Sequence, residues 1–232
     1  MAQISIIIPA LNEAGAIGQV IAEMPWARIA ECLVVDNGST DGTGNVARAA
    51  GARVVESARG YGAACHAGAV AAVGDILVFM DGDGSDVIAG LDALVGPIER
   101  GDADFVIGSR LRGRREQGSM LPSQVFAGWL VGWLLLLTQR VRYTDMGSFR
   151  AIRRDSLERM QMSEMTFGWN LEMQIKACQY GLRIIEIPVD YRRRVAGDSK
   201  VSGDLRASIR AAVRILDVLF RIGLWRRPKS GK

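Results

Sequence analysis

The sequence is poor in the residues that usually carry disulfide, zinc or nucleic-acid chemistry. Its 232 residues include three cysteines and one histidine, and aromatic residues make up 6%. The cysteines lie far apart in apolar contexts, so we expect buried thiols in a reducing cytosol rather than disulfides or zinc ligands. No helix-turn-helix, zinc-finger or aromatic-studded RNA motif accompanies the net charge of +4, so we expect no nucleic-acid partner. The cysteines are Cys32, Cys65 and Cys178.

Long apolar runs are also scarce. The strongest, residues 125–137, contains Trp129 and Trp133 but is shorter than the roughly twenty residues that a membrane-spanning helix needs. It fits a core helix and a helix lying in a membrane interface equally well. The chain opens on a core strand without a charged n-region, so we expect no signal peptide.

Basic residues are concentrated near the carboxyl end of the chain. Over residues 205–225, apolar positions form one helical face and arginines form another. Such a helix is suited to an anionic membrane surface, although it could instead pack back on the domain. We therefore divide the chain into a domain over residues 1–204 and a basic amphipathic helix and tail over residues 205–232.

Short β-branched runs alternate with helical stretches through the first half of the chain. This alternation predicts an α/β fold, with a mostly parallel central sheet and helices on both faces. The predicted strands are 4–9, 32–35, 53–56, 76–80 and 105–107, and the predicted helices include 14–24, 45–50 and 62–73.

Acidic side chains follow three of these strands. Asp81-Gly82-Asp83 comes directly after one buried strand, and Asn12-Glu13 and Asp36 follow two others. The carboxyl ends of parallel strands meet at one edge of a sheet, where ligands bind. Two neighbouring carboxylates favour a hard cation such as Mg²⁺ or Mn²⁺. The pattern indicates a metal-assisted nucleotide cleft, whereas Asp81-Gly82-Asp83 alone could be a solvated turn.

Six motifs follow one another along the chain, at residues 8–13, 35–43, 80–83, 108–110, 143–151 and 194–203. In this order they resemble those of inverting family 2 glycosyltransferases, and the later ones resemble the dolichol-phosphate mannose and glucose synthase branch. The resemblance covers about residues 4–204. Three positions depart from the family pattern: Asn37 stands in place of the second Asp of Asp-Asp-Gly-Ser, Gly82 in place of Ala, and Ser85 in place of Gln.

This resemblance implies a metal-dependent, inverting hexosyltransferase of the GT-A fold. Its donor would be a UDP- or GDP-hexose carrying glucose or mannose, and its acceptor a polyprenyl phosphate. The protein would be cytoplasmic and peripheral on the inner face of the membrane. Two alternatives remain: transfer to a hydroxyl acceptor with Glu172 or Asp145 as base, or a catalytically silent nucleotide-sugar-binding or membrane-scaffold protein.

Individual roles on the donor side follow from strand ends and from the resemblance. Asp81 and Asp83 would hold the metal on the donor diphosphate. Asp36 would accept from the base or ribose hydroxyls, while Ser39, Thr40 or Asp41 would cap the next helix. The base and ribose pocket would be shaped by Pro9, Ala10, Leu11 and Glu13.

A second group of residues would act on the transferred sugar and the acceptor. Arg110, at a strand end, would stabilise charge on the leaving group. A phosphate acceptor needs positive charge rather than a base, and Arg194 and Lys200 fit that role unless they are a solvated charge run. By resemblance Asp145 lies near the donor sugar; Glu172 would contact the sugar hydroxyls or merely pair with an arginine.

Overall fold

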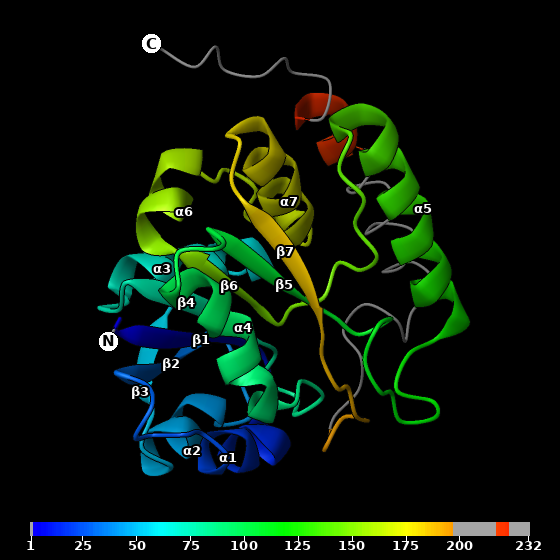
Figure 1. The fold of residues 1–232 in the computed structure, drawn as a ribbon. Coiled ribbons are helices and arrows are strands. Elements are labelled where there is room, and N and C mark those ends of the chain that lie inside the picture. The colour runs from blue at the N-terminus through cyan, green and yellow to red at the C-terminus, as the bar shows by residue number, and fades with distance from the viewer. Residues whose placement is uncertain (1, 197–216, 223–232) are drawn as a thin grey trace.

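The computed structural model describes residues 2–196 and 217–222 of the chain. Strands and helices alternate from the amino terminus, as the sequence predicts (Figure 1). The strands are β1 (Ile4–Ala10), β2 (Glu31–Asp36), β3 (Arg53–Glu56), β4 (Ile76–Phe79), β5 (Phe105–Ser109), β6 (Arg150–Arg153) and β7 (Ile184–Pro188). The α-helices are α1 (Ala14–Ala22), α2 (Thr43–Ala49), α3 (Tyr61–Ala71), α4 (Leu91–Glu99), α5 (Pro122–Gln139), α6 (Arg154–Met160) and α7 (Trp169–Gln179), with a 3-10 turn, η1 (Ile88–Gly90), before α4.

The seven strands form one sheet in the order β3-β2-β1-β4-β6-β5-β7. Only β6 runs against its neighbours, pairing antiparallel with both β4 and β5. The chain builds the sheet outward from β1 to β3, then crosses back to place β4 on the other side of β1. A mostly parallel α/β sheet is therefore confirmed, and its strand order reverses between β1 and β4, where such sheets bind ligands.

Two apolar layers cover the sheet, one on each face. Ile4, Ile6 and Ile8 of β1 belong to the layer that contains α1, α2 and α4. Ile7 points the other way, into the layer that contains α3, α5, α6 and α7, because successive strand residues face opposite sides. Gly68 lets α3 approach closely, since a Cβ there would collide with the Ile7 side chain. Both faces of the sheet are buried, which explains why its strands read as continuous apolar runs.

The start of α2 corrects one expectation. Its N-cap is Gly42, with a φ of 87°, rather than Ser39, Thr40 or Asp41. A left-handed backbone favours glycine, which has no Cβ to clash. Asp41, one residue earlier, still accepts a hydrogen bond from the backbone N–H of Thr43 at 3.0 Å.

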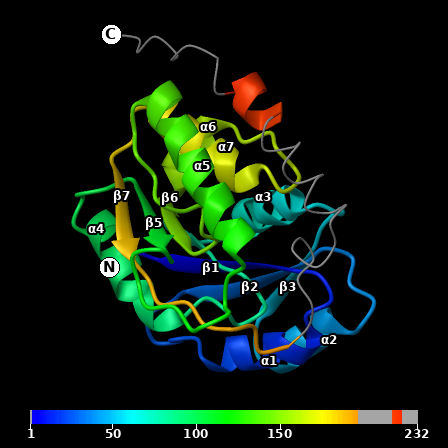
Figure 2. The ribbon, with the colours of Figure 1, turned by 90° about the vertical axis from the view of Figure 1, so that its right-hand side faces the viewer.

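Helix α5 contains the apolar run 125–137 and has two different faces. Val131 and Leu135 are buried in the core, and Gly132 packs against the Tyr143 carbonyl. The opposite face is exposed to solvent, and Figure 2 brings this helix to the front of the molecule. Every helix in the described part of the chain is too short or too polar to cross a bilayer.

One turn of the predicted carboxyl-terminal helix is described, at residues 217–222. Val218 and Leu219 are buried against the α7 side of the core, while Phe220 is exposed. Arg221 pairs with Glu164 at 3.2 Å. This turn thus packs on the domain, whereas the rest of 205–232, and the 197–203 segment with Lys200, lie outside the described residues.

Candidate functional site

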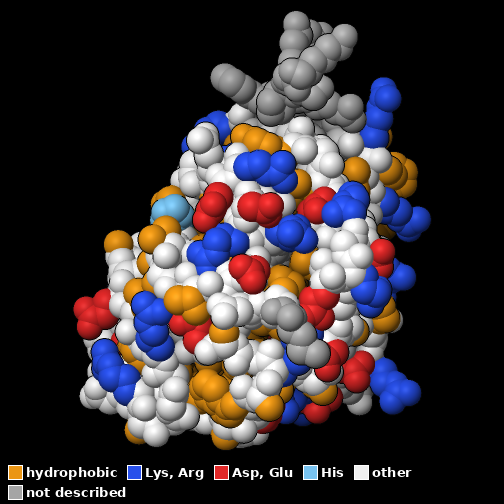
Figure 3. All heavy atoms as spheres, turned by 60° about the vertical axis from the view of Figure 1, so that its left-hand side comes forward, with side chains coloured by type: hydrophobic (Ala, Val, Ile, Leu, Met, Phe, Trp, Pro, Cys, Tyr) orange, Lys and Arg blue, Asp and Glu red, His pale blue; other side chains and the backbone are white. Residues whose placement is uncertain are grey.

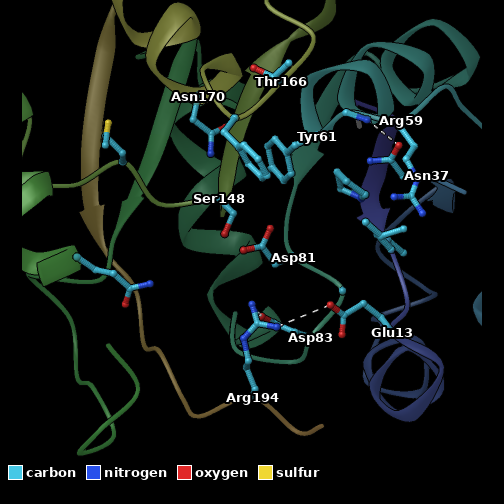
Figure 4. A pocket seen from close by; sticks show the side chains of 18 of the residues that line it. Glu13, Asn37, Arg59, Tyr61, Asp81, Asp83, Ser148, Thr166, Asn170 and Arg194 are labelled. Atoms are coloured by element: carbon cyan, nitrogen blue, oxygen red, sulfur yellow. Dashed lines mark hydrogen bonds and ion pairs between the residues drawn. The ribbon is translucent and has the colours of Figure 1, made fainter. Parts of the chain in front are cut away.

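A cavity of about 630 Å³ opens where the strand order reverses, beside the carboxyl ends of β1 and β4 (Figure 4). Its size is within the usual range for a small-molecule site. It collects acids, arginines and apolar side chains from distant parts of the sequence. It is lined by Pro9, Ala10, Leu11, Glu13, Asn37, Arg59, Gly60, Tyr61, Asp81, Gly82, Asp83, Arg110, Gln124, Met146, Ser148, Thr166, Phe167, Asn170, Tyr191 and Arg194.

The loops after β1 and β2 are tied together at the cavity floor. Asn12 adopts a φ of 52°, a conformation that Asn tolerates better than most residues. Its side chain accepts the Thr40 N–H at 2.8 Å, and its own N–H donates to Ser39 Oγ at 3.0 Å. The Glu13 N–H donates to Thr43 Oγ1 at 2.9 Å. These bonds fix Glu13 beside the cavity.

Asp81 and Asp83 emerge from β4 into a network of hydrogen bonds. Asp83 Oδ1 accepts from the N–H and the hydroxyl of Ser85, at 2.8 and 2.6 Å. The Asp81 N–H donates to Asp86 Oδ2, which also accepts from the Ser148 hydroxyl, both at 2.9 Å. Desolvation, and then the charge of Asp83, raise the pKa of Asp81 to about 6. Burial, and then Asp81, raise the pKa of Asp86 to about 7. A cation bound at this site would therefore stabilise the charged forms of Asp81 and Asp86.

Arg194 brings positive charge to these acids. Its Nη2 lies 2.8 Å from Asp83 Oδ2, and its Nη1 lies 3.7 Å from Glu13 Oε1 (Figure 4). Residues 191–196 run alongside the loop after β4, and the Val195 N–H donates to the Asp83 carbonyl at 3.0 Å. Arg194, which is predicted to contact the acceptor phosphate, thus lies in direct contact with Asp83, which is predicted to bind the metal.

Arg110 follows β5 and is held rigidly at the cavity wall. Its Nε and Nη2 donate to the two carboxylate oxygens of Asp145 at 2.8 and 2.7 Å. Its guanidinium also lies over the Tyr191 ring, 5.0 Å from the centroid. Although burial opposes the shift, Asp145 raises the pKa of Arg110 above its ordinary value. Asp145 itself does not line the cavity. We therefore assign Asp145 to the positioning of Arg110 rather than to contact with a ligand.

Glu172 is also placed differently from the sequence-based expectation. It is fully buried, accepts from the backbone N–H groups of Ser163 and Glu164, and pairs with Lys176 at 2.9 Å. A carboxylate so occupied has no remaining access to the cavity. It instead holds the 163–167 segment, two of whose residues line the cavity. The expected contact between Glu172 and sugar hydroxyls is therefore replaced by a structural role.

Of the residues expected to bind the nucleotide, Pro9, Ala10, Leu11 and Glu13 line the cavity, whereas Asp36 does not. Asp36 Oδ1 accepts the Ser39 N–H at 2.8 Å, which directs this carboxylate to its own loop. The neighbouring Asn37 lines the cavity and accepts the Gly60 N–H at 2.9 Å.

Sequence reasoning missed several cavity residues for two reasons. Arg59 and Tyr61 follow β3, so the strand-end rule could have found them. Gln124, Phe167 and Asn170 come from helices and loops without any strand-end signal.

The donor set fits a divalent metal only in part. Across residues 2–196 and 217–222, no three His, Cys, Asp or Glu side chains converge as a metal site. Asp81 and Asp83 are nevertheless oxygen ligands of the kind that Mg²⁺ and Mn²⁺ prefer, and Mg²⁺ is commonly held by one or two carboxylates together with substrate phosphates. The residues thus suit a cation completed by a bound diphosphate.

One face of the molecule carries side chains of both charges. On the face drawn in Figure 3, acidic and basic side chains are interspersed, and the lone histidine, His66, is an exposed residue. A nucleic-acid-binding face would concentrate arginine and lysine in a patch or stripe.

Solved structures identify the fold. The fold matches glucosyl-3-phosphoglycerate synthase from Mycobacterium tuberculosis in complex with phosphoglyceric acid, with a TM-score of 0.76 and 24% identity, over 99% of this chain and 82% of that one. The same synthase in complex with Mn²⁺ and UDP-glucose matches with a TM-score of 0.73 and 26% identity, over 99% and 81%. The architecture is that of a GT-A glycosyltransferase.

Sequence relatives identify the family. The model of glycosyl transferase family 2 matches residues 5–161, and the chain belongs to this family. An uncharacterized glycosyltransferase of Mycobacterium tuberculosis is 38% identical over 216 residues, covering 92% of this chain and 95% of that protein. The undecaprenyl-phosphate mannosyltransferase of Micrococcus luteus is 31% identical over 218 residues, covering 86% and 87%. Each is a protein that this chain resembles.

Proposed function

We propose that this glycosyltransferase moves a hexose from a nucleotide-diphosphate sugar to a polyprenyl phosphate, with inversion at the anomeric carbon. The observation that carries the proposal is the charge arrangement of the cavity. Arg110 and Arg194 line the cavity together with the loops after β1 and β2, while the nearby carboxylates Asp145 and Glu172 are occupied by protein donors. The site thus supplies two arginines, and the two carboxylates considered as bases, Asp145 and Glu172, are engaged in other contacts.

An anionic acceptor explains this balance. A hydroxyl nucleophile needs a carboxylate or similar base to take its proton, whereas a phosphate oxygen is already charged. Asp145 is bound at both oxygens by Arg110, and Glu172 is closed off by backbone N–H groups and Lys176. Transfer to a hydroxyl with either residue as base is therefore disfavoured.

The donor diphosphate would lie between the acids and the arginines. A divalent cation bound by Asp81 and Asp83 would neutralise charge on the phosphates as a Lewis acid. Arg110, already fixed by Asp145 and Tyr191, would stabilise the leaving group without reorganisation. Arg194 would contact the acceptor phosphate once its contact with Asp83 is exchanged for the cation.

Two further considerations support the proposal. The Micrococcus luteus relative is named for transfer of mannose to undecaprenyl phosphate, and the Mn²⁺ complex of the solved synthase contains a UDP-sugar. A catalytically silent binding or scaffold protein would have no need of Asp81, Asp83, Arg110 and Arg194 around one cavity. Because a polyprenyl phosphate lies in a membrane, the proposed acceptor would place the enzyme at a membrane surface.

The test is a product assay with matched acceptors. UDP-glucose and GDP-mannose are each incubated with Mn²⁺ and a short-chain polyprenyl phosphate, the corresponding polyprenol, or 3-phosphoglycerate. We expect a polyprenyl phosphate hexose, β-linked by the anomeric coupling in its NMR spectrum, and no polyprenol product. Transfer to the polyprenol or to 3-phosphoglycerate alone would overturn the acceptor assignment.

A further inference from the structure

The outer face of α5 is a continuous apolar stripe. Five large side chains recur at spacings of three and four residues, which places them on one side of the helix. Phe126 and Trp129 have ring centroids 6.1 Å apart, and Trp129 and Trp133 have centroids 6.3 Å apart. The stripe consists of Phe126 (62% exposed), Trp129 (55%), Leu130 (42%), Trp133 (50%) and Leu137 (69%).

We propose that this α5 stripe docks the enzyme on a phospholipid bilayer. The helix contains no Asp, Glu, Lys or Arg between Pro122 and Gln139, so both of its faces are apolar: one buried in the core and one exposed. A contiguous exposed apolar stripe indicates an interaction site. Trp and Phe on one face of a helix too short to span a bilayer are typical of an interfacial helix.

The charges around α5 favour anionic lipid over a protein partner. Within the chain from Arg110 to Thr144, Glu116 is the only acid, whereas six arginines are present. Arg114 and Arg115 are exposed before the helix, and Arg140 and Arg142 are exposed after it. Basic side chains near a bilayer are attracted to anionic headgroups.

The stripe and the cavity lie on opposite sides of the first turn of α5. Gln124 lines the cavity, whereas Phe126, two residues later, points to the other side of the helix. A bilayer contacting the stripe would therefore lie about one helix diameter, roughly 10 Å, from the site. The consequence that a lipid acceptor can reach the cavity without leaving the membrane rests on the proposed function, whereas the docking itself does not.

Vesicle binding tests the stripe directly. The full chain is mixed with vesicles of phosphatidylcholine and phosphatidylglycerol in equal parts, and the bound fraction is measured by sedimentation. We expect Trp129→Ser with Trp133→Ser to weaken binding at least about tenfold, because large apolar side chains lose burial in the bilayer. Trp26→Ser, which alters a tryptophan that is 45% exposed outside α5, should leave binding unchanged. Equal binding by the double variant and the wild type would overturn the proposal.

Two measurements address other occupants of the stripe. Dimerisation of the wild type that is lost in the double variant, with no vesicle binding by either, would identify a second copy of the chain and overturn the proposal. Protection of Trp129 and Trp133 from acrylamide in the absence of vesicles would mean that another segment of this chain, such as 197–216, covers them, and would also overturn it. Quenching of Trp129 and Trp133 fluorescence by brominated lipid in the wild type supports docking.

Transfer assays separate this proposal from the proposed function. The double variant should transfer to a water-soluble short-chain prenyl phosphate at the wild-type rate but lose transfer to a long-chain acceptor in vesicles. Failure of the wild type on both acceptors, with vesicle binding intact, would refute the proposed function and leave the docking surface standing. Equal loss on both acceptors in the double variant would contradict a role limited to docking.

Discussion

The donor side of the cavity and the α5 side are built on opposite principles. Around β1 and β4, polar groups are buried and tied by short hydrogen bonds, as in the Ser85 contacts to Asp83. Along α5, large apolar groups stand exposed with no charged residue on the helix. Buried charge and exposed apolar surface both cost stability unless a partner offsets them. Under the proposed function, the cavity would bind the polar donor, and the α5 stripe would contact the membrane that holds the apolar body of the acceptor.

The largest effect should follow from neutralising the second acid after β4. Asp83→Asn keeps the shape of the side chain but removes the charge that would hold the cation, so we expect transfer to fall about a hundred- to a thousandfold. Donor binding in the presence of Mn²⁺, measured by calorimetry, should weaken as well. Asp92→Asn, an exposed acid paired with Arg28, is the control. Undiminished turnover in Asp83→Asn would show that transfer does not need a cation held by this carboxylate.

A smaller loss of transfer but a large loss of stability should follow from Asp145→Asn. Breaking a buried ion pair costs about 3–5 kcal/mol, and Arg110 would no longer be held at the cavity. Asp104→Asn provides a matched control, because Asp104 binds Arg183 with the same two-oxygen geometry at an exposed site. Thermal unfolding and transfer should change in the first variant and hardly at all in the second.

The dependence of stability on acid pH provides a second test of the Asp145–Arg110 pair. Burial alone would raise the pKa of Asp145, but the hydrogen bonds and charge of Arg110 lower it below its ordinary value. The stability from this pair is therefore present above the ordinary Asp pKa and is lost as pH falls toward the lowered one. Asp145→Asn should flatten this part of the unfolding curve. If the stability of Asp145→Asn fell with decreasing pH as steeply as that of the wild type, the Asp145–Arg110 pair would not form in solution.

Arg194→Ala should have two modest effects of opposite sign, one on Mn²⁺ affinity and one on transfer. Its guanidinium contacts Asp83, so in the absence of donor it competes with a cation for that carboxylate. We expect Mn²⁺ affinity without donor to rise about threefold or more as the nearby positive charge is removed, while transfer falls. Arg193→Ala, which removes a neighbouring arginine bound to the Gln117 carbonyl, should change neither. Weaker Mn²⁺ binding in Arg194→Ala would show that Arg194 does not compete.

The sequence allows the donor side to be predicted better than the α5 side. Buried strands ending in acids locate β1, β4 and the positions of Glu13, Asp81 and Asp83 at one edge, because strand direction alone fixes them. The partners of Asp145 and Glu172 could not be predicted, because they depend on contacts between segments far apart in sequence. The sequence also could not show which face of α5 is buried, since both faces are apolar and only tertiary packing distinguishes them.

The central claim is that a positively charged side chain, rather than a carboxylate base, acts on the acceptor phosphate. The most direct measurement compares transfer to polyprenyl phosphate by Arg194→Lys and Glu172→Gln, normalised to folded protein. Arg194→Lys keeps the charge but loses two-point contact with phosphate oxygens, so we expect a loss of about tenfold or more. Glu172→Gln should retain most of the rate per folded molecule. Abolished transfer in Glu172→Gln with a nearly silent Arg194→Lys would contradict the account and restore a hydroxyl acceptor with a catalytic base.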